Sequence, residues 1–190
     1  MVTARARWLI GAVLLASCSS ARHTFPPRPA DGSSRWAAVG EPAPPFALRA
    51  LAGPAQSLSG YAGRVVVVDF WATFCGPCRQ ELPALEALRA RHPEVAILAV
   101  SIDDADSDER VAALARELHL GFPVLRDPDG AVAFRYMKFA MAPLTALIGK
   151  DGRVRSIHRG YAPPLAVLLE EEVKEALADV PSEESAMGEP

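Results

Sequence analysis

Residues 64–83 read RVVVVDFWATFCGPCRQELP, and this stretch decides the fold. Four consecutive valines followed by an acid and two aromatic residues are typical of a central strand that is covered on both faces. The pair Cys75–Cys78 follows where this strand ends, and from Gly76 to about His92 the leucine spacing predicts a helix. The segment therefore predicts a buried strand that leads through a cysteine pair into a helix.

The rest of the chain alternates between strand and helix patterns. Strands are expected at residues 95–102, 122–125, 144–148 and 153–158, with one more at 46–51, and helices at residues 107–120, 128–136 and 165–177. This order predicts an α/β fold with a central mixed β-sheet flanked by helices. The last two strands are joined by a Gly-Lys-Asp-Gly turn, so they form a hairpin that supplies an antiparallel edge.

Length and composition limit what the chain can be. Its 190 residues are half hydrophobic and 23% charged, which fits one globular domain with short appendages and excludes a mostly disordered chain. The formal net charge of −3 argues against a nucleic-acid partner, which would favour a basic surface. Three cysteines are too few for a small fold held together by disulfides.

The first residues carry a targeting pattern. Residues 1–17 combine two arginines with an apolar run that is too short to span a bilayer, as in a signal peptide. The run ends in Leu-Ala-Ser-Cys, which resembles the lipobox of bacterial lipoproteins, with Cys18 as the lipidated residue. An ordinary cleavage site or a chance cysteine is the alternative. We expect a lipid-anchored protein on the extracytoplasmic side of a bacterial envelope, in the outer membrane if the host is Gram-negative.

The domain boundaries follow from shifts in composition. Residues 18–41 are rich in Ser, Pro, Ala and Arg and show no periodicity, so they are expected to form a flexible tether. Residues 42–178 contain the strand and helix patterns and form the folded domain. Residues 179–190 are polar and acidic and are expected to be a disordered tail.

The sequence CGPC, residues 75–78, first of all indicates redox chemistry. At a helix N-terminus, unpaired N–H groups favour negative charge, so the pKa of Cys75 should fall and its thiolate should act as the nucleophile. Gly76 and Pro77 form the turn between the cysteines, and Cys78, one turn further on, can close a disulfide as the resolving thiol. A zinc half-site and a purely structural disulfide are the alternatives. Zinc needs four ligands, and the four histidines form no ligand pair (His23, His92, His119 and His158).

The stretch VVDFWATFCGPCRQELP, residues 67–83, resembles the thioredoxin superfamily, and more narrowly its extracytoplasmic TlpA/ResA-like thiol–disulfide oxidoreductases. The resemblance covers about residues 42–178 and implies a thioredoxin-like fold. The additional strand and helix between Val95 and Leu125 match this subfamily better than plain thioredoxin.

The resemblance also implies roles for two acids. Asp69 matches a buried carboxylate that helps to remove the proton of the resolving thiol, although TlpA-like relatives more often carry Asn there. Glu81, three residues after Cys78, matches a glutamate near the pair. Because both acids are present, the identity of the general base stays open, and each could instead be a solvated surface acid.

Four further residues match the expected substrate-binding side of the motif. Pro143 matches a cis-proline that faces the cysteines, and Ala142 before it would pair with an extended substrate peptide as an added strand. Trp71 and Phe74, at the end of the strand and just before Cys75, complete the set. A tryptophan that ends a central strand is otherwise an ordinary core residue.

The sequence thus favours a thiol–disulfide oxidoreductase that reduces substrate disulfides through the CGPC dithiol, without metal or cofactor. The resemblance implies disulfide-containing client proteins such as apocytochrome c, and a membrane reductase that restores the dithiol. One alternative is a peroxiredoxin-like peroxidase, which needs Thr three residues before its reactive Cys; here that residue is Ala72. The other is a non-catalytic envelope lipoprotein.

Overall fold

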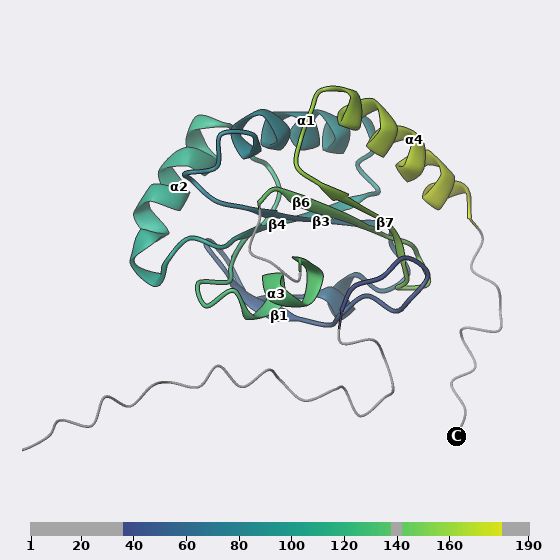
Figure 1. Cartoon of the computed structure of the whole chain (residues 1–190), viewed down its shortest axis with the longest axis horizontal. Coiled ribbons are helices and arrows are strands. Elements are labelled where there is room, and N and C mark those ends of the chain that lie inside the picture. Colours follow the sequence, from purple (N-terminus) through teal and green to yellow (C-terminus); the bar gives the residue numbers. More distant parts are fainter. Residues whose placement is uncertain (1–35, 138–141, 180–190) are drawn as a thin grey trace, which may run out of the picture.

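The valine run forms β3 (Val66–Trp71), which lies inside a mixed sheet (Figure 1). The computed structural model describes residues 36–137 and 142–179, and within these ranges the sheet has seven strands in the order β2-β1-β5-β4-β3-β6-β7. The other strands are β1 (Ala47–Ala50), β2 (Gln56–Ser57), β4 (Ala96–Ser101), β5 (Val124–Arg126), β6 (Leu144–Ile148) and β7 (Val154–Arg159). Every residue of β3 and β4 is buried, as expected of strands covered on both faces.

The strand directions confirm the expected mixed sheet. β3, β4 and β5 run parallel, whereas β6 and β7 form an antiparallel hairpin on the β3 side. β1 pairs antiparallel with β5, so the strand expected at residues 46–51 is present. β2 was not expected, because two residues are too few to show a period. The parallel strands place the carboxyl ends of β3 and β4 at the same edge of the sheet.

Helices cover both faces of this sheet. Figure 1 shows α1 (Cys78–Arg91), α2 (Asp108–Glu117) and α4 (Pro164–Ala178) on one face and α3 (Ala131–Met137) on the other. Two short 3-10 turns, η1 (Leu58–Tyr61) and η2 (Ala105–Ser107), complete the described elements. One hydrophobic core joins α1, α2 and α4 to the sheet and includes both cysteines. The other joins α3 to the opposite face.

Residues 36–41, which the sequence assigns to the tether, pack onto the domain instead. The N–H of Ala37 donates to Arg135 O and the N–H of Gly40 to Val154 O, both at 2.8 Å. The rings of Trp36 and Phe134 meet edge to face at 5.0 Å. Ala37 is buried in the core beneath α3, so burial of apolar surface, which composition alone did not reveal, holds residues 36–41 against the domain.

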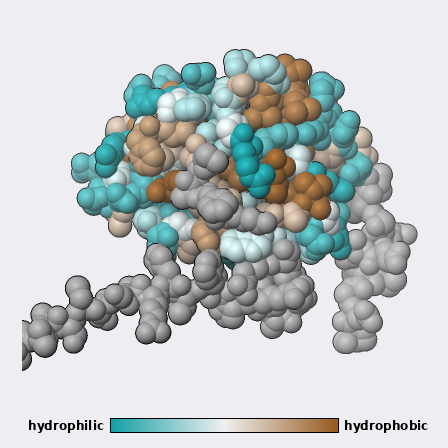
Figure 2. Space-filling view, in the orientation of Figure 1, coloured by the Kyte–Doolittle hydropathy of each residue, from teal (hydrophilic) through white to brown (hydrophobic). Residues whose placement is uncertain are grey.

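Two helices differ from the sequence expectation. α2 stops at Glu117 rather than just before Gly121, because His119 adopts a left-handed backbone with φ of 54° and ends the helix early. In α4, Leu168 was expected on the apolar face but is 51% exposed, while Leu169, Val173 and Ala176 are buried. Figure 2 shows the resulting apolar patch over the first turns of α4.

No helix within residues 36–137 and 142–179 has the length and apolar character needed to cross a membrane. The expected signal peptide, Cys18 and the tail beyond Asp179 lie outside the residues that the structure describes.

Candidate active site

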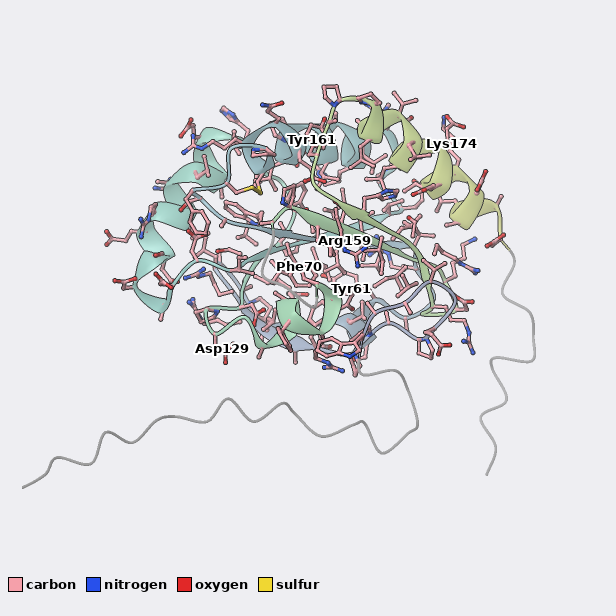
Figure 3. All side chains as sticks on the ribbon, in the orientation of Figure 1. Tyr61, Phe70, Asp129, Arg159, Tyr161 and Lys174 are labelled. Atoms are coloured by element: carbon pink, nitrogen blue, oxygen red, sulfur yellow. A yellow bond between two sulfur atoms is a disulfide. The ribbon has the colours of Figure 1, made fainter. Side chains whose placement is uncertain are left out.

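The cysteine pair lies where β3 gives way to α1, and its sulfurs form a disulfide (Figure 3). The Cα atoms of Cys75 and Cys78 are 5.3 Å apart. Cys75 keeps 8% of its surface exposed and Cys78 only 1%, so Cys75 is less open than the sequence suggested but is the more accessible of the two. The backbone N–H of Cys78 donates to the Cys75 sulfur at 3.2 Å. That contact stabilises negative charge on this sulfur.

Gly76 and Pro77 form the turn between the cysteines and are both exposed. Pro77 has a helical backbone, and its carbonyl accepts hydrogen bonds from the N–H groups of Gln80 and Glu81 at 3.0 and 3.1 Å. Its missing N–H costs nothing at the start of a helix. α1 therefore begins at Cys78, two residues later than expected, with the disulfide across its first turn.

A buried carboxylate holds the loop that precedes Cys75. Asp103 is 2% exposed and accepts hydrogen bonds from the backbone N–H of Thr73 at 3.0 Å and from the Thr73 hydroxyl at 2.5 Å. The Ser101 hydroxyl donates to Oδ2 of the same carboxylate at 3.0 Å. Because β3 and β4 are parallel neighbours, their carboxyl ends bring these residues together.

A buried arginine supports this arrangement from β5. Arg126 is 2% exposed and donates to Ser101 Oγ at 2.6 Å and to the carbonyl oxygens of Asp103 and Asp104 at 3.2 and 2.7 Å. Its charge is balanced by Asp108 at the start of α2, with Nε 2.7 Å from Oδ1. The loop before the reactive cysteine is thus fixed by a network that spans three neighbouring strands and a helix.

Two acids lie beneath the disulfide. Asp69 is on the same face of β3 as Trp71, and Glu81 is one turn after Cys78 on α1; their exposed fractions are 0% and 2%. Thr145 of β6 is the register partner of Asp69, and its hydroxyl donates to Glu81 Oε1 at 2.5 Å. β3, β6 and α1 therefore bring both predicted acids together around Thr145.

Burial raises the pKa values of both acids. It raises the pKa of Asp69 well above its usual value of 3.8, and the neighbouring Glu81 raises it further. Burial raises the pKa of Glu81 from 4.5 to about 7, against a smaller opposing effect of the Thr145 hydrogen bond. Once the disulfide is reduced, two carboxyls with raised pKa values can accept and return the proton of a nearby thiol. Neither acid is the solvated surface residue that the sequence left open.

The two predicted aromatic contacts lie in opposite environments. Phe74 is 81% exposed directly before Cys75, where it can meet a docking protein. Trp71 is fully buried in the core that contains both cysteines. The position of Trp71 corrects its assignment as a substrate contact, because the last residue of a doubly covered strand faces the core and leaves no ring surface for a partner.

The predicted proline is cis, in the bond Ala142–Pro143, directly before β6. Pro143 is buried, and its carbonyl accepts a hydrogen bond from Gly160 at 2.8 Å. Ala142 is half-buried and packs against the core that holds the two cysteines. Ala142 thus packs against the same core as the cysteines, and the substrate-binding roles of Ala142 and Pro143 stay predictions.

Among the side chains that the structure describes, no three of His, Cys, Asp and Glu gather in a way that could hold a metal ion. The pairing of Cys75 with Cys78 gives each sulfur a covalent partner. The site as described is a disulfide with two buried acids and a braced loop.

The residues missed by sequence reasoning are Asp103, Thr73, Arg126 and Thr145. Asp103, Arg126 and Thr145 belong to no recognisable motif, and Thr73, although inside the motif of residues 67–83, carries no sign of its partner in the sequence. One signal was present: Ser101 and Asp103 follow a buried strand, and polar residues at the carboxyl end of a parallel strand often line a site.

Comparison with known proteins agrees with this geometry. Residues 39–157 match the model of the AhpC/TSA family. The thioredoxin-like protein YneN of Bacillus subtilis is 38% identical over 124 residues, which cover 64% of this chain and 71% of YneN. The thiol–disulfide oxidoreductase ResA of Geobacillus kaustophilus is 32% identical over 123 residues, covering 65% of this chain and 70% of ResA.

Solved structures show the same fold. A chain from Chlorobium tepidum, described as a thiol:disulfide interchange protein DsbE, superposes with a TM-score of 0.69 and 30% identity. The match covers 75% of this chain and 99% of that one. These similarities confirm the predicted thioredoxin-like fold and the oxidoreductase interpretation. The chain therefore belongs to the AhpC/TSA family and, within it, to the thioredoxin-like thiol–disulfide oxidoreductases.

Proposed function

We propose that this oxidoreductase reduces disulfides of other proteins through its Cys75–Cys78 dithiol. The observation that carries the proposal is the order of exposure at the site. Cys75 is the more accessible sulfur, it lies at the N-terminus of α1, and it follows the exposed ring of Phe74. A partner protein can cover Phe74 and bring its own disulfide to Cys75, whereas Cys78 stays inside.

The reaction is thiol–disulfide exchange in two steps. The Cys75 thiolate attacks one sulfur of the client disulfide, forms a mixed disulfide and releases the other client sulfur as a thiolate, which takes a proton from water. Cys78 then attacks the Cys75 sulfur, closes the internal disulfide and releases the second client sulfur. Two electrons pass from the dithiol to the client, and an external dithiol reductase must return them.

The second step needs a base, because the thiol of Cys78 must lose its proton before it attacks. Glu81 lies one turn along α1 from Cys78, and Asp69 lies beside it on β3. We assign the proton of Cys78 to this carboxyl pair as a unit, because the two acids are coupled through burial and charge. The proton ends on the departing client thiolate or in solvent.

The backbone at Ala142 supports the binding part of the proposal. It precedes β6 next to the disulfide, where an extended client segment can add to the chain as a short strand. The exposed ring of Phe74, directly before Cys75, would give the client a second contact. Clients are therefore proteins with an accessible disulfide in an extended segment.

A peroxidase function finds less support at this site. Such chemistry would use a threonine hydroxyl turned toward the reactive cysteine. The position three residues before Cys75 is Ala72, and the hydroxyl of the neighbouring Thr73 gives its hydrogen to Asp103. Peroxide consumption by the purified dithiol protein, at a rate comparable with disulfide reduction, would favour this alternative.

The proposed location is the extracytoplasmic side of a bacterial envelope, with a lipid on Cys18. Its support is the sequence of residues 1–18: two arginines, an apolar run and a lipobox. Incorporation of a labelled fatty acid by the full chain, and its loss in Cys18→Ser, would test the anchor. The client and the reductase would then act on the same side of the membrane.

Trapping tests the mechanism. In Cys78→Ala the second step cannot occur, so mixed disulfides between Cys75 and clients should accumulate and identify those clients by mass spectrometry. Cys75→Ala is the matched control and should trap nothing. The reduced wild type should also reduce insulin. If insulin stays oxidised and Cys78→Ala traps no more than Cys75→Ala, the protein is a binding lipoprotein rather than a reductase.

A further inference from the structure

The unpaired polar atoms of the core all belong to one cluster. Among the described residues, the buried side-chain oxygen and nitrogen atoms without a hydrogen-bond partner are both carboxylate oxygens of Asp69, Nε1 of Trp71 and Oε2 of Glu81. Buried polar groups are normally paired, so each exception calls for a physical reason such as catalysis or internal water. Here the exceptions share one face of β3 and the first turns of α1.

Glu81 also lines a crevice that runs between α1 and α4. The crevice has a cavity volume of about 10 Å³, and leucines from both helices form much of its wall. The space is close to that needed for one water molecule. Ala84 of α1 and Ala166 of α4 keep it open, since longer side chains at either position would fill it.

Only two residues in the wall of this crevice are polar, Glu81 and Tyr161. Tyr161 is half-buried on the segment between β7 and α4, and Figure 3 shows it next to α1. Burial raises the pKa of its hydroxyl, and the charge of Glu81 raises it further, which places the two groups near one another. An unpaired carboxylate oxygen and a phenol, on two residues that line a one-water space, provide the two partners that such a water needs.

We propose that this crevice holds a water molecule that carries protons between Glu81 and solvent, with Tyr161 at its outer end. Glu81 Oε1 is occupied by Thr145, so Oε2 is the oxygen left for this water. Asp69 is fully buried and reaches the crevice through Glu81. Protons thus leave the acid pair on the helix face between α1 and α4, through Tyr161.

The catalytic meaning of this route rests on the proposed function. Each time Cys78 gives its proton to the acid pair, that proton must leave before the pair can act again. With this route the proton reaches solvent from Glu81 without returning through Cys78. No bond other than O–H is made or broken along the route.

A titration tests the route independently of activity. The groups that face Glu81 are Asp69 from β3, Thr145 from β6 and Tyr161, and α4 contributes only apolar side chains to the crevice. In the oxidised full chain the cysteines do not titrate, so NMR of the Glu81 side-chain carboxyl reports this environment. Tyr161→Ala opens the crevice to bulk water and should lower the proton affinity of Glu81 about tenfold, which is one pH unit in its midpoint.

Two leucine substitutions on α1 form a matched pair. Ala84→Leu fills the crevice, so the proton affinity of Glu81 should rise about tenfold and its proton release after a pH jump should slow. Ala87→Leu, on an exposed face of the same helix, should titrate like the wild type. Tyr161→Phe keeps the ring but removes the hydroxyl, and should slow proton release without opening the crevice.

The results of these titrations distinguish a failure of the proton route from a failure of the proposed function. If Ala84→Leu and Tyr161→Phe titrate and release protons as Ala87→Leu does, the route is wrong even when the wild type reduces insulin normally. If the expected shifts occur in a protein that reduces no disulfide, the route stands and the proposed function fails. Circular dichroism confirms that each variant has folded.

Discussion

At the scale of single residues, the carboxyl of Glu81 shows which of two opposing effects prevails. A negative charge in the first turn of a helix gains up to about 1 kcal/mol from the helix dipole, which would lower its pKa. Burial instead raises this pKa from 4.5 to about 7, which corresponds to about 3 kcal/mol in the other direction. Desolvation therefore prevails, and Glu81 can accept a proton near neutral pH. The helix dipole alone would keep this carboxyl ionised.

The first prediction concerns stability and pH. Because the pKa of Glu81 is higher in the folded state, the folded protein binds more protons than the unfolded chain between pH 4.5 and about 7. The free energy of unfolding should fall across this window by about 3 kcal/mol, and Asp69, whose pKa is also raised by folding, should add to the fall. Urea unfolding of the oxidised protein at several pH values measures this.

Glu81→Gln provides the control for that prediction. The amide can still accept the hydrogen bond of Thr145 but does not titrate, so the part of the fall between pH 4.5 and 7 should disappear. An unfolding free energy that keeps the same pH slope in this variant would show that other groups cause it. Glu170→Gln, at an exposed ion pair on α4, should leave the slope almost unchanged.

A second prediction concerns the resolving step. Asp69→Asn and Glu81→Gln each remove one acceptor for the Cys78 proton, and each should slow resolution of a mixed disulfide about 100-fold at neutral pH. The mixed disulfide itself should form at nearly the wild-type rate, since Cys75 starts the reaction. Stopped-flow with a fluorescent disulfide peptide separates the two steps. Equal slowing of both would mean that the acids act on Cys75.

The cysteine pair and the two acids proposed to act on it were predictable from the sequence, while the residues that hold them were not. The cysteines and the two acids occur in one continuous motif, so the sequence identifies them. Thr145 lies 64 residues from Glu81, and only the antiparallel pairing of β3 with β6 brings them together. Trp71 was misassigned because a motif position does not tell which way a side chain points.

At the scale of elements, the connection between β3 and α1 is as constrained as the strands beside it. Asp103 and Arg126 tie this loop to the ends of β4 and β5, although no sequence motif marks the contact. The core elements themselves were predicted well, because buried valine and leucine runs carry a clear period. β6 has the predicted bounds, Leu144–Ile148. Helix ends were predicted less well, because they depend on single backbone conformations such as that of His119.

A third prediction tests this loop. Thr73→Val removes the hydroxyl that donates to the buried Asp103 carboxylate and should lower the free energy of unfolding by about 2 kcal/mol. Thr73→Ser keeps the hydroxyl and should lose less. The valine variant should also widen the range of Cys75 positions, so its reaction with a client disulfide should slow. Guanidinium unfolding and stopped-flow kinetics measure the two effects. Equal stability of the two variants would contradict the bracing role of Asp103.

At the scale of the whole molecule, residues 36–46, which precede β1, cover the face of the sheet opposite the active site. Phe46 is buried there against Tyr136, whose hydroxyl donates to the carbonyl of Pro44 at 2.8 Å. Ala37 and Ala43 complete this cover. The folded unit therefore includes residues that composition assigned to a tether, because proline-rich segments can pack even without a periodic pattern.

The fourth prediction follows from this cover. A chain that starts at residue 36 should unfold at the same denaturant concentration as one that starts at residue 19. A chain that starts at residue 47 loses Phe46 and the segment before it, and should be less stable by at least about 3 kcal/mol. Guanidinium unfolding followed by circular dichroism compares the three. Equal midpoints for all three would show that the segment contributes nothing.

The burial of the disulfide affects how fast the Cys75–Cys78 couple exchanges with thiols in its surroundings. Small dissolved thiols must reach a sulfur to exchange with it, and the two sulfurs here belong to residues that are 8% and 1% exposed. Exchange with a macromolecule that docks over Phe74 does not face the same obstacle. Exchange with small thiols is thus slowed relative to exchange with docked proteins, so the redox state of the couple is set mainly by the proteins it meets.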